Sequence, residues 1–106
     1  RDRMQLEPLP LAAFCEHFLD GFASSQGLAA GVIVLQIADD LTICFDRNHL
    51  HQILWNLVAN AMRHGTCGLG SVCLRACPAA AGGQIELHVI HDGGGVPEAI
   101  GMRLFA

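Results

Sequence analysis

Residues 46–65, DRNHLHQILWNLVANAMRHG, decide how the rest of the chain is organised. Their apolar residues recur at intervals of three and four, which is the spacing of one face of an α-helix. Asp46 can cap the first turn by accepting from backbone N–H groups, and Gly65 can end the helix. The stretch therefore predicts an amphipathic helix that packs on a core. Its core-facing stripe consists of Leu50, Ile53, Leu54, Leu57, Val58 and Ala61.

A row of amide side chains runs beside this stripe. Gln52, Asn56 and Asn60 stand one helical turn apart, and Arg63 and His64 follow one turn later. A surface helix more commonly places Glu, Lys or Arg there. An amide oxygen can bind a hard cation, but an amide also satisfies nearby backbone groups. Periodicity alone leaves both interpretations open.

Composition excludes several classes of protein. The 106 residues suit one domain with a modest core, and 52% hydrophobic against 15% charged residues excludes a disordered tail. A net charge of −4, with six Arg and no Lys, argues against a nucleic-acid partner. The odd count of five cysteines, without zinc-type spacing, indicates reduced thiols in a cytoplasmic protein.

The remaining segments alternate between helical and strand-like patterns. We expect a helix at 9–26, a hairpin of strands at 31–37 and 41–45, strands at 71–77 and 84–91, and a short helix from Pro97 to Phe105. This order predicts an α+β fold. We expect a two-layer sandwich with the helices on one face of a mixed, mostly antiparallel sheet.

Two stretches together carry a family resemblance. LHQILWNLVANAMRH, and then a strand that runs into DGGGVPEAIGMRLF, resemble the N box and the G1 box of sensor histidine kinase ATP-binding domains. These domains have the Bergerat-type fold shared by gyrase, Hsp90, histidine kinases and MutL. The terminal MRLFA resembles the start of that family's F box. The likeness covers nearly the whole chain and implies binding of ATP and Mg²⁺.

The resemblance assigns roles to residues of the N box. Asn60 matches the asparagine that binds Mg²⁺, and Asn56 matches the preceding asparagine that faces the phosphates. Arg63 matches a basic residue that contacts the phosphates, so Asn56 and Arg63 are the expected catalytic residues. His64 matches a position that packs near the adenine.

The G1 box matches the family less well. Gly93 and Gly95 correspond to its two glycines, but counting back from Val96-Pro97 puts His91 where the family has the aspartate that binds adenine. Asp92 falls one place later, on the other side of a strand. Either Asp92 swings into the site or His91 takes the aspartate's place. We favour His91, which can accept one hydrogen bond when neutral.

The resemblance also implies a larger protein. We expect residues 1–8 to be a linker from an upstream dimerisation and phosphoacceptor domain, and residues 9–106 to be a partial ATP-binding domain. The family's lid, second glycine box and further strands would follow, so we expect the C-terminal part of the fold to be missing. That would leave an edge strand and an uncovered apolar face, and we expect weak nucleotide binding and self-association of this chain.

The implied whole protein is a histidine protein kinase of a two-component system, located in the cytoplasm or forming the cytoplasmic part of a membrane-anchored sensor. It would pass the γ-phosphoryl group of ATP to a histidine on the separate domain, and from there to a response regulator. The chain alone would be inactive. An alternative is a degenerate ATPase-like module that serves as a protein-interaction platform. A hydrolase of the repair or topoisomerase type is disfavoured, because Gln52 and Asn56 stand where it would need a glutamate base.

Overall fold

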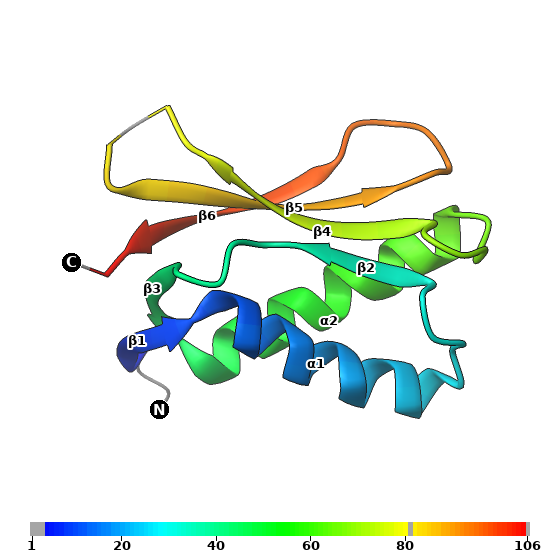
Figure 1. The fold of residues 1–106 in the computed structure, drawn as a ribbon, viewed down its shortest axis with the longest axis horizontal. Helices are drawn as coiled ribbons and strands as arrows, with labels where there is room; N and C mark the ends of the chain where they lie inside the picture. Colours follow the sequence, from blue (N-terminus) through cyan, green and yellow to red (C-terminus); the bar gives the residue numbers. More distant parts are fainter. Residues whose placement is uncertain (1–3, 81, 106) are drawn as a thin grey trace.

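Two helices lie side by side on one face of a six-stranded sheet in the computed structural model, which describes residues 4–80 and 82–105 (Figure 1). The helices are α1 (Leu11–Gln26) and α2 (Arg47–His64). The strands are β1 (Leu6–Pro10), β2 (Ile33–Gln36), β3 (Thr42–Asp46), β4 (Val72–Pro78), β5 (Gln84–His91) and β6 (Glu98–Leu104). Within the described residues, neither helix combines the length and hydropathy needed to cross a bilayer.

The sheet has the strand order β1-β3-β6-β5-β4-β2. Among the strand pairs of residues 4–80 and 82–105, only β2 and β4 are parallel, and the other four pairs are antiparallel. The predicted α+β class, with helices on one face of a mixed and mostly antiparallel sheet, is therefore confirmed.

The predicted hairpin of residues 31–37 and 41–45 is wrong. β2 forms one edge of the sheet and pairs with β4, whereas β3 lies near the other edge, between β1 and β6. The connection Ala38-Asp39-Asp40 lacks the Asn-Gly or Gly-X pair that a tight hairpin turn favours, so nothing local holds the two strands together.

The strand β1 was also missed, because the two prolines of LEPLP are typical of a linker. Proline is tolerated at a sheet edge, where its missing N–H costs no ladder hydrogen bond, and β1 is an edge strand. Residues 6–8 of the predicted linker therefore belong to the sheet. The upstream domain stays a prediction.

The predicted short helix from Pro97 to Phe105 is also wrong, because this segment forms β6. Its apolar residues Ile100, Met102 and Leu104 alternate with exposed ones, and Met102 is only 3% exposed. This period of two matches a strand, and Gly101 weakens a helix. β6 pairs with both β3 and β5, so the sheet has no gap between them.

The predicted central helix is confirmed. The Asp46 carboxylate accepts from the backbone N–H of His49 at 2.8 Å and from that of Gln5 at 2.7 Å, so it caps α2 and ties it to the chain before β1. Gly65 ends α2 in an extended conformation (φ −92°) rather than a left-handed one. Four residues of the predicted stripe are fully buried and the other two are half-buried: Leu50, Leu54, Val58 and Ala61, then Ile53 and Leu57.

An aromatic cluster joins the two helices at the base of the core. Phe22 of α1 lies with its ring centroid 4.8 Å from that of Trp55 of α2, and Phe18 lies 5.8 Å from Phe22. Nearby, Cys15 is buried, and this burial raises the pKa of its thiol to about 12. All five cysteines are free in the structure.

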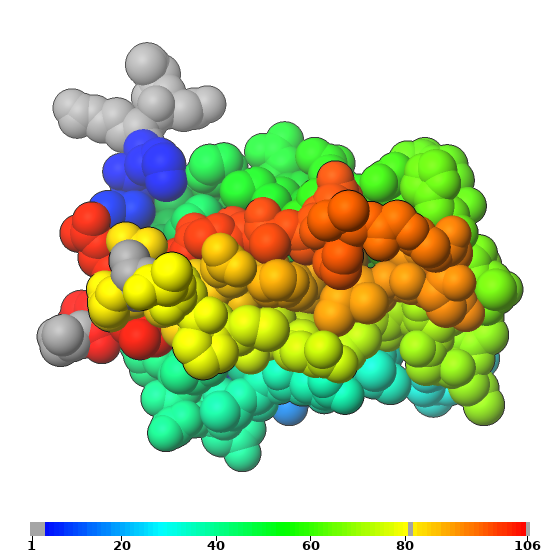
Figure 2. Space-filling model, turned by 90° about the horizontal axis from the view of Figure 1, so that it is seen from above, coloured from blue at the N-terminus to red at the C-terminus, as the bar shows by residue number. Residues whose placement is uncertain are grey.

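In the part of the chain that the structure describes, the opposite face of the sheet carries no helix. Figure 2 looks onto this face, where β6, β5 and β4 themselves form the surface. Its side chains mix half-buried apolar groups such as Cys73 and Ile90 with polar pairs. Arg75 donates to Gln36 at 2.6 Å, for example.

Candidate functional site

The last two turns of α2 face the connection between β5 and β6. A hollow of about 270 Å³ lies there, and it is lined by Asn60 and His64 from α2, by His91 at the end of β5, by the glycines 93–95, and by Glu98 at the start of β6. The N-box and G1-box residues, which are about 30 positions apart in the sequence, therefore meet at one site. This juxtaposition is the one that the sequence predicted.

A second hollow, of about 490 Å³, adjoins the first along α2. Asn56, Asn60 and Arg63 line it together with Trp55 and Glu98. Asn60 and Glu98 belong to both hollows, so they mark the boundary between them. The site thus has an imidazole-rich end beside the glycines and an amide and guanidinium end beside Trp55.

Asn60 is held between two charged side chains. Arg63 donates from Nη2 to Asn60 Oδ1 at 3.2 Å, and Asn60 donates from Nδ2 to Glu98 Oε1 at 3.4 Å. These contacts fix which side of the amide faces which neighbour. The amide oxygen therefore points toward Arg63 and the amide nitrogen toward Glu98.

His91 and Asp92 take different directions. The half-buried His91 ring lines the first hollow, stacks on the His64 ring with the centroids 6.1 Å apart, and accepts at Nδ1 from the Gly93 N–H at 3.0 Å. His91 therefore has the inward position that strand alternation predicted for it. Whether it contacts adenine stays a prediction.

Asp92 instead ties the end of α2 to the end of β5. Its carboxylate accepts from the Thr66 hydroxyl at 2.6 Å and from the Thr66 backbone N–H at 2.9 Å. These hydrogen bonds hold the pKa of Asp92 below its usual range, and the bond from the hydroxyl has the larger effect. Asp92 does not line the hollow, so the alternative in which it swings into the site is not what the structure shows.

The glycines of the turn serve two different purposes. A Cβ at Gly93 would collide with the carbonyl group of His64, so only glycine lets the turn approach the end of α2. Gly94 and Gly95 have φ values of +88° and +87°, which favour glycine. The sequence had singled out Gly93 and Gly95. The need for Gly94 was missed, although the run of three glycines signals it.

Glu98 is the other residue that sequence reasoning missed. Pro97 had suggested a helix, in which Glu98 would be an ordinary first-turn residue. In β6 it pairs with Val89, on the inward face of the sheet, and reaches Asn60. The period-two pattern of residues 98–104 could have revealed this.

The chemical groups at this site suit a ligand that has both a flat ring and anionic oxygens. Arg63 and the amide nitrogen of Asn56 can contact anionic oxygens. The oxygens of Asn60 and Glu98 are ligands that a hard cation such as Mg²⁺ accepts. Two imidazole rings and a glycine backbone at the other end can contact a flat ring.

Comparison with known proteins identifies the family. Residues 45–106, more than half of the chain, match the family described as histidine kinase-, DNA gyrase B- and HSP90-like ATPase. A comparison with curated proteins finds no match.

Three similar solved structures are histidine kinases. The Acinetobacter baumannii histidine kinase AdeS has a TM-score of 0.67 and 21% identity, over 90% of this chain and 46% of that one. Full-length ShkA in complex with AMPPNP has a TM-score of 0.62 and 25% identity, over 83% of this chain and 19% of that one. The catalytic domain of the histidine kinase ThkA has a TM-score of 0.59 and 18% identity, over 90% of this chain and 63% of that one.

The chain thus spans less than two thirds of each of these proteins. Its fold is that of histidine kinase ATP-binding domains, and the family match coincides with α2, the glycine turn and β6, which form the site. The chain therefore belongs to the histidine kinase-, DNA gyrase B- and HSP90-like ATPase family.

Proposed function

We propose that this chain is the ATP-binding catalytic part of a two-component sensor histidine kinase, which transfers the γ-phosphoryl group of ATP to a histidine on a separate domain. The observation that carries the proposal is the pair of adjoining hollows that share Asn60 and Glu98. The family match and the similar histidine kinases give it further support.

In this proposal the two hollows receive different parts of ATP. The adenine lies in the smaller hollow, against His64 and His91 and above the backbone of Gly93 and Gly95. The triphosphate extends into the larger hollow, toward Asn56 and Arg63. This orientation follows from charge, because Arg63 is the cation that lines the larger hollow.

The residues at the boundary fit Mg²⁺. The amide of Asn60 and the carboxylate of Glu98 each offer a hard oxygen donor, and the metal leaves its other positions to water and phosphate. Because the amide nitrogen faces Glu98 at 3.4 Å, the amide would have to turn over for both oxygens to face one metal. Bound Mg²⁺ would supply charge neutralisation along the phosphates. Asn60 would first have to give up its 3.2 Å contact with Arg63, which frees the guanidinium for the phosphates.

The chain's own residues then act by positioning. Arg63 and Asn56 orient the terminal phosphate, so that the P–O bond to ADP breaks while a P–N bond forms to the accepting histidine of the other domain. We place that histidine, the response regulator and self-association among the proposed partners. We also propose a cytoplasmic location, which the free cysteines support.

Titration with a fluorescent ATP analogue in the presence of Mg²⁺ tests the proposal. Asn60→Ala should weaken binding at least about tenfold, because it removes a metal ligand. Asn48→Ala is the matched control, since Asn48 lies at the other end of α2, and it should leave binding unchanged. Equal affinities for the three proteins would refute the assignment of the site.

A second candidate function is supported by one observation. His91 lines the smaller hollow and stands where the resemblance places the family's adenine-binding aspartate; in this second candidate the module has lost ATP and kept the fold as a protein-interaction platform. Wild type that fails to bind the analogue, both alone and when the chain is extended at its C-terminus, would favour the platform over the kinase.

A further inference from the structure

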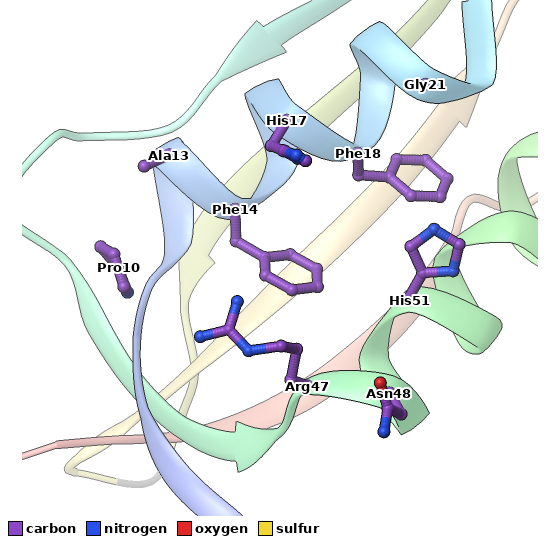
Figure 3. Close-up of a pocket in the computed structure, with 9 residues that line it drawn as sticks. All are labelled: Pro10, Ala13, Phe14, His17, Phe18, Gly21, Arg47, Asn48 and His51. Carbon is purple, nitrogen blue, oxygen red and sulfur yellow. The ribbon is translucent and has the colours of Figure 1, made fainter.

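A third hollow, of about 480 Å³, lies between α1 and the first turn of α2, away from the nucleotide site (Figure 3). Its floor is mostly apolar, because the rings of Phe14 and Phe18 project from α1 into the space between the helices, and His17 is the polar residue of α1 that also lines it. Ala13 and Gly21 leave room on either side of these rings. A flat hydrophobic group can therefore lie against α1.

The opposite wall is polar and carries a positive charge. Arg47 reaches from the start of α2 toward Phe14, and Asn48 and His51 stand beside it (Figure 3). Among the described residues that line this hollow, none is Asp or Glu. The one ion pair of Arg47 within the described residues is with Glu7 at 3.4 Å, and both side chains are about half exposed. Such a pair is weak, so a ligand carboxylate can displace it.

We propose that this groove binds a small aromatic carboxylate, with its ring on Phe14 and Phe18 and its carboxylate on the Arg47 guanidinium. The volume lies in the range of small-molecule sites. A neutral aromatic compound would leave the Arg47 guanidinium without a partner, and an aliphatic polyanion would leave the half-buried Phe14 ring uncovered. The site shares no lining residue with the two hollows near Asn60, so the inference does not depend on nucleotide binding.

The test uses the whole chain, 2-naphthoate as the acid and 2-naphthylmethanol as its neutral counterpart, followed by ¹H–¹⁵N NMR shifts. A ligand of this size should bind with a Kd on the order of 1 mM. The shifts should gather on α1 and on the first turn of α2. Arg47→Met should weaken the acid about tenfold and leave the alcohol unchanged, because it removes only the charged contact. Arg103→Met, on the exposed side of β6, is the matched control and should change neither.

A second variant blocks the groove without touching charge. Gly21→Leu adds a side chain that lines the hollow, at a helical position where a new Cβ would meet nothing within 4 Å, so the variant should fold and should lose both ligands. Equal affinity for acid and alcohol, acid binding that survives Arg47→Met, or shifts centred on Asn60 would overturn the proposal. So would shifts at these same residues that depend on protein concentration without ligand, because a second copy would then occupy the groove.

Discussion

Replacing Glu98 with Gln tests the most unexpected feature of the nucleotide site, which is a carboxylate beside the residue proposed to face the phosphates and Mg²⁺. The substitution removes one negative charge, keeps the size of the side chain and retains one of its two oxygens. Glu98 Oε1 lies 3.4 Å from Asn60 Nδ2. Without metal, a phosphate oxygen bound to that nitrogen must approach this carboxylate.

The geometry sets the size of the effect. A phosphate oxygen that accepts from Asn60 Nδ2 lies about 3 Å from it, and therefore at most about 6.4 Å from Glu98 Oε1. Two unit charges at that distance repel by about 0.6 kcal/mol in bulk water and by about 2.6 kcal/mol at an effective dielectric constant of 20. Because Glu98 is exposed, the lower part of this range applies. We expect Glu98→Gln to tighten metal-free ATP binding about three- to tenfold at low salt.

Adding Mg²⁺ should remove the advantage of Glu98→Gln over the wild type. The metal turns the carboxylate from a repelling group into a ligand, so Mg²⁺ should improve the affinity of the wild type more than that of Glu98→Gln, by about tenfold. The assay is titration with a fluorescent ATP analogue in EDTA and in Mg²⁺. Glu16→Gln, an exposed change of the same charge on α1, is the control. If Mg²⁺ improves the affinity of Glu98→Gln as much as that of the wild type, this reasoning is refuted. If neither protein binds the analogue under any condition, the result counts against the nucleotide site itself.

Three further predictions concern single residues. His91→Asp should tighten binding of the same analogue about tenfold by supplying a charged acceptor, and a wild type that already binds as tightly would contradict the proposed role of His91. Cys67→Gly should raise the free energy of unfolding by about 0.5–1 kcal/mol in urea titrations, because Cys67 has a φ of +65°, and glycine relieves that strain at some entropic cost. The pKa values of Asp46 and Asp92 lie below their usual range because backbone and Thr66 donors hold the ionised forms. The contribution of the two ionised carboxylates to stability is therefore complete above a pH of about 4 and is lost as the pH falls through their folded-state pKa values. Asp46→Asn and Asp92→Asn should each make stability less dependent on pH in this range. Urea unfolding midpoints measured between pH 6 and pH 3 check this.

The parts of the fold that follow from local pattern were predictable from the sequence. α2 has a cap, a periodic stripe and a terminating glycine, and β5 has clean alternation, so their positions were predicted closely. The pairing of strands was not predictable, because β2 finds its partner 39 positions later, at the register of Ile33 with Val72. Such pairing depends on the whole sheet, and no residue of β2 itself encodes it.

The site was predictable only where a motif names its residues. Asn60 and Gly93 belong to recognisable motifs, and both line the smaller hollow. Glu98 carries none, and its role depends on a segment whose proline signals a helix while its alternation signals a strand. Burial decides between the two structures. As a strand, the segment fits between β3 and β5 and buries Met102 against the core.

The distribution of charge along the site has a consequence for how nucleotide binding is controlled. At the proposed ring end, His91 stands where the resemblance places the family's aspartate, and Asp92 is engaged with Thr66 instead. At the phosphate end, Glu98 adds a carboxylate beside Arg63 and Asn60. In the proposed orientation of ATP, adenine would therefore lack a charged acceptor, while the phosphates would meet an additional negative charge. Both changes would weaken binding of the free nucleotide, and a divalent cation would relieve only the second. Affinity in this site should consequently depend on Mg²⁺ more steeply than in a site with the aspartate at the ring end and no acid beside the amides.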